Sequence, residues 1–272
     1  EQTASIIGNS DIEKCMHLKC LKNGIYNIKT GKFSTEFNPD HVILNYIPHE
    51  FKERGYDMIE TRVREIIPDD KDRQTFYDAI SNCMHPYTGI DFQLGLVSIP
   101  GAGKTQLAKL IKMSLGEKNV SFSSIHDIAK DKTVQRDIAY NFLNIDDDLS
   151  SEDLRWVDVL KRWITQDDFS GRSIYAHTST YRPTTRLMFM GNGLYEITNP
   201  DDAEAIYERT HLIKLVNKYR HTSKEEVNIF ENIKNLDQEL DGFITYLLKN
   251  TTWIFENKKI HHRQSTNTTR SM

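Results

Sequence analysis

The segment best suited to chemistry is residues 98–105, which reads Ser-Ile-Pro-Gly-Ala-Gly-Lys-Thr. An apolar run over residues 92–97 precedes it, and apolar residues at helical spacing follow it up to Leu115, where Gly116 is a stop signal. A strand, a glycine-rich turn and a helix that opens on Gly-Lys-Thr form a phosphate-binding loop. This arrangement predicts a nucleoside triphosphate site.

In such a loop, backbone N–H groups and the helix N-terminus hold phosphate oxygens. Lys104 would reach the β- and γ-phosphates, and the Thr105 hydroxyl would bind Mg²⁺. The usual pattern begins with glycine, where this chain has Ser98, and a coincidental loop is the alternative. The residues predicted to contact the nucleotide are Pro100, Gly101, Ala102, Gly103, Lys104, Thr105 and Gln106.

A second apolar stretch, residues 140–145, ends in three carboxylates, Asp146, Asp147 and Asp148. In an ATPase, one carboxylate at such a strand tip holds the metal and its neighbour polarises the attacking water. We assign Asp146 to Mg²⁺ and Asp147 to the water, with Asp147 and Asp148 as the alternative register. An acidic turn that caps the next helix is the purely structural alternative.

Two more residues could complete a hydrolytic site. Asn192 follows the apolar run 186–191, where its amide could bond the γ-phosphate or the attacking water. Arg209 stands between a short acidic helix and the strand 210–216, where an arginine can reach the γ-phosphate of a neighbouring subunit. A turn asparagine and a surface salt bridge are the ordinary alternatives.

The alternating stretch 167–183 predicts a hairpin that carries Arg172, Tyr175, His177 and Arg182. Basic and aromatic side chains on a protruding hairpin suit phosphate contact and base stacking. A plain edge hairpin explains the pattern equally well.

The remaining elements must position these groups. Two short strands with turns at Asn23-Gly24 and Thr30-Gly31 open the chain, and two helices separated by Pro68 follow over residues 57–84. Further helices are expected over 152–166 and 224–249, and the polar, basic end from Asn257 is expected to fray.

Composition bounds the class of protein. The chain has 272 residues, of which 38% are hydrophobic and 27% charged, with a net charge of −4. This balance predicts a soluble globular protein and argues against one that coats nucleic acid, although a local basic channel remains compatible. No apolar run reaches membrane-spanning length, and the three cysteines suit a reducing cytosol, so we expect a cytoplasmic protein of a bacterium or an infected host cell.

The order of these parts resembles the superfamily 3 helicases and, among them, the helicase part of the phage, plasmid and poxvirus primase–helicases. Residues 21–26 with Thr30-Gly31 resemble the entry of their helicase-associated region. Residues 160–168 resemble their Leu-Lys-x-hydrophobic-Thr-Gly-Gly-Asp segment, and residues 239–248 resemble their closing helix. The departures are Ser98, Gln166-Asp167 at the two glycine positions, and a hairpin tip without lysine.

The resemblance implies roles. Lys104 and Thr105 would be the Walker A pair, Asp146 and Asp147 the Walker B pair, and Asn192 the sensor. Arg209 would act on the next subunit. The segment from Lys161 through the hairpin would move DNA. Family members form hexameric rings on single-stranded DNA and translocate 3′ to 5′. No primase part is visible in this sequence, so we expect a primase to lie upstream or on another polypeptide, or to be absent.

We therefore expect an α/β fold with an AAA+-like P-loop core, its parallel sheet between helices, over residues 89–216. A helicase-associated segment, 1–88, would precede it, and a helical part with a basic tail, 217–272, would follow. The expected function is an ATP- and Mg²⁺-dependent DNA helicase of a viral or mobile-element replication protein. The alternatives are an ATP-switched initiator or loader and a monomeric small-molecule kinase.

Overall fold

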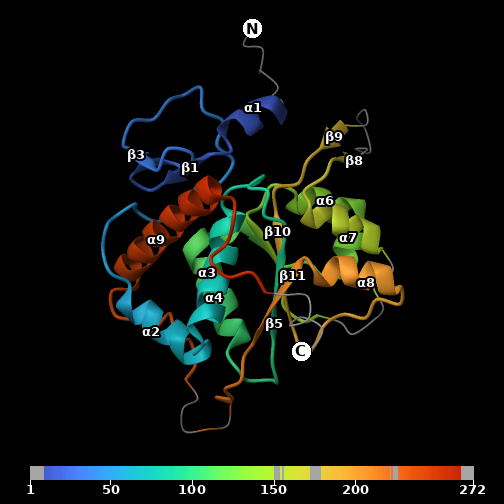
Figure 1. The fold of residues 1–272 in the computed structure, drawn as a ribbon. Helices are drawn as coiled ribbons and strands as arrows, with labels where there is room; N and C mark the ends of the chain where they lie inside the picture. The colour runs from blue at the N-terminus through green and yellow to red at the C-terminus, as the bar shows by residue number, and fades with distance from the viewer. Residues whose placement is uncertain are drawn as a thin grey trace.

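The computed structural model describes residues 9–149, 154, 156–171, 179–220, 222 and 226–264. Its centre is a parallel sheet with the strand order β11-β5-β10-β7-β6 (Figure 1). Every residue of β5 and β10 is buried, as expected for a sheet covered on both faces. In that order, the five strands are β11 (Thr210–Lys214), β5 (Gln93–Val97), β10 (Arg186–Gly191), β7 (Leu143–Asp146) and β6 (Val120–Ser121).

Helices cover both faces of this sheet, and each face has its own hydrophobic cluster (Figure 1). Along β10, Met188 and Met190 belong to one cluster, whereas Leu187 and Phe189 belong to the other, as the alternation of side chains along a strand requires. The first cluster joins the sheet to α2 (Asp57–Ile66), α3 (Asp70–Cys83), α4 (Lys104–Leu115) and α9 (Leu236–Asn257). The second joins it to α5 (Ile125–Lys130), α6 (Lys132–Ile138), α7 (Val157–Ile164) and α8 (Pro200–Tyr207).

The middle of β5 is too crowded for a side chain. A Cβ on Gly95 would lie 2.4 Å from Cζ of Phe189 and 2.5 Å from Cδ2 of Leu212. Rings and methyl groups of both neighbouring strands therefore close over Gly95, and this packing fixes the strand that leads into the loop 98–103.

A second sheet, of order β3-β2-β1-β4, lies beside the upper end of α9 (Figure 1). Its strands follow α1 (Asn9–Cys15) and are β1 (Leu18–Leu21), β2 (Gly24–Asn27), β3 (Lys32–Ser34) and β4 (Tyr46–Ile47). The turns at Asn23-Gly24 and Thr30-Gly31 are confirmed, but three strands form over this stretch where the sequence predicted two.

The hydrophobic core crosses both expected part boundaries. Leu21, Leu94 and Leu240 belong to the same buried cluster, although they come from the three parts that the sequence suggested. The Tyr26 hydroxyl also shares a hydrogen bond of 3.0 Å with the Thr252 hydroxyl of α9. Residues 21–88 therefore pack as a continuation of the central core.

The expected hairpin is present at its base. Strands β8 (Phe169–Gly171) and β9 (Ser179–Tyr181) are antiparallel, with Phe169 opposite Tyr181. Arg172, Tyr175 and His177 lie outside the described residues. The helix expected over 152–166 is represented by α7, which begins at Val157.

The C-terminal prediction was wrong in two respects. The helix begins at Leu236, not at residue 224, because Asn228 and Asn235 both adopt left-handed backbone with φ of 58°, and it continues to Asn257. The tail does not fray over residues 258–264. His261 stacks on Trp253 at 3.8 Å and bonds Asp78, and the Gln264 amide pairs with both backbone groups of Leu212, at 2.7 Å each.

This pairing satisfies backbone groups on β11, which is an edge strand of the central sheet. Within the described part of the chain, no helix combines the length and apolar character needed to cross a membrane.

Candidate nucleotide-binding site

The loop between β5 and α4 turns on two glycines. Gly101 has φ of 85°, and Gly103, which directly precedes α4, has φ of 100°. Both values lie in the left-handed region that favours glycine. A Cβ on Gly101 would also lie 2.3 Å from Cβ of Arg220. Ser98 is not among the positive-φ residues, which explains why serine is tolerated where related loops begin with glycine.

Lys104 lies at the first position of α4, and three oxygen atoms hold its ammonium group. Nζ donates to the Ser98 carbonyl oxygen at 2.8 Å, to the Ser98 hydroxyl at 2.9 Å and to the Gly191 carbonyl oxygen at 3.2 Å. Burial lowers the pKa of Lys104, and the negative charge of Asp148 opposes this shift. The serine thus supplies the lysine with a partner that glycine would lack.

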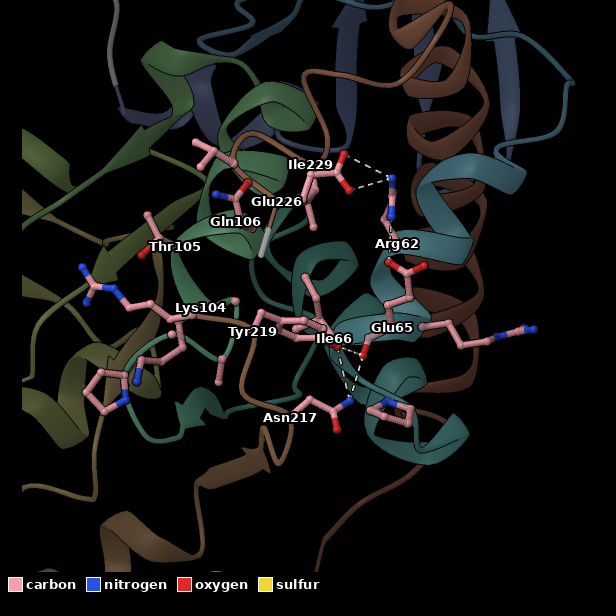
Figure 2. Close-up of a pocket in the computed structure, with 18 of the residues that line it drawn as sticks. Arg62, Glu65, Ile66, Lys104, Thr105, Gln106, Asn217, Tyr219, Glu226 and Ile229 are labelled. Carbon is pink, nitrogen blue, oxygen red and sulfur yellow. Dashed lines mark hydrogen bonds and ion pairs between the residues drawn. The ribbon is translucent and has the colours of Figure 1, made fainter. Parts of the chain in front are cut away.

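A cavity of about 1010 Å³ opens beside the N-terminus of α4, between that helix and α2 (Figure 2). All seven loop residues predicted to contact a nucleotide line it, from Pro100 to Gln106, and Asn192 joins them from the end of β10. The loop, Asn192 and the third aspartate therefore meet at one edge of the sheet, where β5, β10 and β7 end.

The three aspartates after β7 have different surroundings. Asp146 is only 4% exposed, and its Oδ2 accepts the backbone N–H of Ile125 at the start of α5, at 2.8 Å. Burial raises the pKa of Asp146, whereas the N–H groups of Ile125 and Asp148 act in the opposite direction. Asp147 and Asp148 are exposed, and Asp148 is the one that lines the cavity.

Arg209 is not brought to the cavity of its own chain. It precedes β11 at the opposite end of the sheet, where its carbonyl oxygen accepts the N–H of Gln93, the first residue of β5. Its guanidinium Nη1 donates to the Ala205 carbonyl oxygen at the end of α8, at 2.7 Å.

Two predicted DNA contacts, Lys161 and Arg182, are also held within the chain. Lys161 forms ion pairs with Asp202 of α8 and, at 3.7 Å, with Asp158. The Arg182 guanidinium stacks on the ring of Tyr87 at 3.9 Å, and its Nε donates to the Gln166 carbonyl oxygen at 2.5 Å.

Sequence reasoning missed the far wall of the cavity. It is built by α2 and by the segment after β11, which meet through the Glu65 carbonyl oxygen (Figure 2). That oxygen accepts bonds from the Tyr219 hydroxyl and, at 3.1 Å, from the Asn217 amide. The N–H of Tyr219 donates in turn to the Gly101 carbonyl oxygen at 3.0 Å. These partners lie far apart in sequence, and no local motif marks them.

Two family models match separate parts of the chain. One is described as D5 N terminal like and matches residues 7–83. The other is a family of unknown function (DUF5906) and matches residues 96–209, from the end of β5 to the residue before β11. A search of curated proteins gives no significant match.

Solved structures show the same fold. An A form apo structure of the NrS-1 C-terminal region has a TM-score of 0.55 and 16% identity, covering 74% of this chain and 47% of that one. A second A form apo structure, of NrS-1 residues 305–718, has a TM-score of 0.53 and 15% identity, with coverages of 78% and 53%. An apo structure of the same region has a TM-score of 0.53 and 12% identity, and the match covers 89% of this chain and 72% of that one. The chain spans about half the length of the first two.

Proposed function

We propose that this chain is an ATP-dependent DNA helicase module of a viral or mobile-element replication protein, with an AAA+-like P-loop core. The observation that carries the proposal is the meeting of Lys104, Asp148 and Asn192 in one cavity at the carboxyl ends of parallel strands. Ligands of open α/β sheets bind at this edge. The D5 N terminal like match adds support, because it falls within the segment whose sequence resembles the helicase-associated region.

The loop would hold the triphosphate. Backbone N–H groups at the start of α4 and the Lys104 ammonium are positive groups on the cavity wall, and they suit the β- and γ-phosphates. The exposed Thr105 hydroxyl is a hard oxygen donor on the same cavity, so it fits Mg²⁺. When bound, this ion would neutralise charge on the phosphates.

Placement of the aspartates favours the alternative register. Asp148 faces the cavity, whereas the Asp146 carboxylate is committed to the N-terminus of α5. We assign Asp148 to the activation of the attacking water and Asp147 to the binding of Mg²⁺. Asn192, also on the cavity, would orient the water or the γ-phosphate.

The site is completed by a neighbouring subunit in this proposal. Arg209 lies at the opposite end of the sheet from the loop of its own chain, so it would serve the site of the next protomer in a ring, which we take to be a hexamer. The hairpin that starts at β8 would follow single-stranded DNA, with Arg182 at its base and Lys161 on α7 supporting it. A primase would act upstream or in trans.

The decisive experiment measures ATPase activity with and without single-stranded DNA, together with oligomer size, for the chain and for Lys104→Ala. A helicase requires stimulation by DNA, a nucleotide-dependent oligomer, and loss of hydrolysis in the variant. ATP hydrolysis that ignores DNA in an oligomer would favour an initiator or loader. A monomer under every nucleotide condition, without DNA stimulation, would refute the helicase proposal and favour a small-molecule kinase.

A further inference from the structure

The segment that follows α9 carries a cluster of positive charges. Residues 258–263, which we call the basic strip, read Lys-Lys-Ile-His-His-Arg, so three full positive charges lie close together in a chain whose net charge is −4. Lys258, Lys259 and Arg263 are exposed. Among the described residues, no carboxylate forms an ion pair with any of the three. Their charge is therefore available to a partner.

The backbone of the basic strip is fixed to the core. Ile260, in its middle, is 7% exposed and belongs to the larger hydrophobic cluster. The N–H of His261 donates to Oδ2 of Asp78 at 2.7 Å, and Nδ1 of its ring lies 2.9 Å from Oδ1 of the same carboxylate. Just beyond the strip, the Gln264 side chain bonds both backbone groups of Leu212. Because the segment is already ordered, little conformational entropy is lost when a partner binds its cations.

Aromatic rings support the strip, but its own side chains cover them. The Lys258 ammonium lies 3.9 Å from the ring centre of Phe255. The His261 ring stacks on Trp253 at 3.8 Å, and the Lys259 ammonium lies 5.9 Å from the centre of the same indole. Sites for single-stranded nucleic acid combine cations with rings on which bases stack. The strip offers cations over covered rings, which favours the phosphate backbone of a duplex, whose bases are already stacked.

The basic strip lies at the same end of the central sheet as the base of the hairpin. The N–H of Gln264, next to Arg263, donates at 3.4 Å to Nδ1 of His211, the second residue of β11. The hairpin strand β9 leads into Arg186, the first residue of β10. Because these strands are parallel, both starts lie at one edge of the sheet, and the loop 98–103 lies at the other. Figure 1 shows the chain running from the upper end of α9 down to β11.

We propose that the basic strip is a second DNA-contact surface, which binds the phosphate backbone of duplex DNA beside the hairpin through Lys258, Lys259 and Arg263. The surface is separate from the nucleotide-binding cavity and from the DNA contacts assigned to the hairpin and to Lys161. The inference rests on the proposed helicase function only for the choice of DNA as the nucleic acid. Contacts to phosphates carry no sequence information, so binding depends on salt and not on base sequence.

The test titrates the full chain into labelled duplex DNA and into single-stranded DNA of the same length, with fluorescence anisotropy at several salt concentrations. The triple variant Lys258→Gln/Lys259→Gln/Arg263→Gln should bind the duplex about tenfold or more weakly at about 0.1 M salt. The slope of log affinity against log salt should fall by about 2.7, which is about 0.9 for each lost phosphate contact. Affinity for the single strand should change by about twofold at most, because the hairpin is untouched.

The matched control is Lys118→Gln/Lys130→Gln/Lys132→Gln, which removes the same charge from exposed lysines that flank β6, the opposite edge strand of the central sheet. It should change duplex affinity by about twofold at most, because distant exposed charges are screened. Thermal melts check that both variants fold. Equal losses in the two variants, or an unchanged duplex affinity in the strip variant, would overturn the proposed surface. Equal losses for duplex and single strand would overturn the assignment to duplex DNA.

ATP hydrolysis stimulated by single-stranded DNA, measured on the same proteins, tests the proposed function separately. The strip variant should retain it, because the strip lies at the opposite end of the sheet from the cavity. A wild type that binds duplex through the strip but shows no stimulated hydrolysis would refute the helicase and leave the strip in place. A wild type with stimulated hydrolysis that binds no duplex would refute the strip alone.

Discussion

The Gln166 amide oxygen accepts the backbone N–H of Tyr87 at 3.0 Å, and both residues have left-handed backbone, with φ of 56° and 61°. Gln166 stands where the helicases that this sequence resembles have glycine. Its Nε2 donates to the Thr184 carbonyl oxygen at 2.9 Å. One side chain thus joins the end of α7 to the residues that precede β5 and β10, which offsets the backbone strain that glycine would avoid.

Replacing Gln166 should reveal this balance. Gln166→Gly would relieve roughly 1 kcal/mol of backbone strain but leave two backbone groups without partners, at about 1–3 kcal/mol each. We expect the free energy of unfolding in urea to fall by about 1–5 kcal/mol. Gln166→Ala should lose about 1 kcal/mol more, because alanine keeps the strain.

Asp167→Gly is the control, because Asp167 occupies the other glycine position but is exposed and is not a positive-φ residue. It should change stability by less than about 1 kcal/mol. If the Gln166→Gly protein were as stable as the wild type, the two hydrogen bonds of the Gln166 side chain would contribute no more stability than its backbone strain costs.

The aspartates after β7 give the second prediction. Asp148→Asn should lower ATP turnover by about 100-fold or more with ATP binding retained, because it removes the carboxylate that faces the cavity. Asp146→Asn should have the smaller effect on turnover, since its amide oxygen can still accept the Ile125 N–H and burial already disfavours the charged form, although the amide cannot also accept the Asp148 N–H. Steady-state kinetics of ATP hydrolysis by the two variants decides between the two registers of the aspartates. A larger loss in Asp146→Asn than in Asp148→Asn would restore the first register.

Local sequence signals were sufficient to predict the unit formed by β5, the loop 98–103 and α4. The apolar run before the loop and the glycine after the helix gave β5 and α4 closely, because both ends are set by the nearby sequence. Pro68 likewise separated α2 from α3, and the alternating pattern located the base of the hairpin.

The features that the sequence did not predict depend on tertiary contacts. Three consecutive aspartates look alike in sequence, and only the packing of α5 selects Asp146 as its anchor. The contact of Tyr219 with Glu65 joins residues that are 154 positions apart, so no periodicity could reveal this wall of the cavity. Gln264 was assigned to a fraying tail because its partner, the edge strand β11, lies elsewhere in the chain.

The position of Arg209 gives a third prediction. Arg209→Ala and Lys104→Ala should each reduce ATPase activity to near background, because in the proposed ring each removes one half of a site shared between subunits. Equal mixing of the two variants places an intact loop against an intact arginine at roughly one interface in four, so part of the activity should return. Mixed rings without any recovery would contradict action in trans. Thermal melts of Arg209→Ala control for the lost bond to Ala205.

A buried lysine far from the cavity should make stability depend on pH. Lys19 is 3% exposed, its Nζ donates to the Met16 carbonyl oxygen at 2.8 Å, and the Phe142 ring lies 5.1 Å away. Burial lowers its pKa to about 7. In the unfolded chain a lysine titrates near 10.4, so between these two values the unfolded state binds more protons and stability rises with pH.

Lys19→Met isolates this effect, because other titrating groups contribute equally to both proteins. Below about pH 7 the wild type carries the full cost of a buried cation, so the variant should be the more stable protein there, despite the lost bond to Met16. The difference in unfolding free energy should shrink by roughly 4 kcal/mol between pH 6 and pH 10, measured by urea unfolding. Lys22→Met, at an exposed lysine, should show no such trend. A difference for Lys19→Met that stays constant with pH would mean that Lys19 remains charged in the folded protein throughout this range.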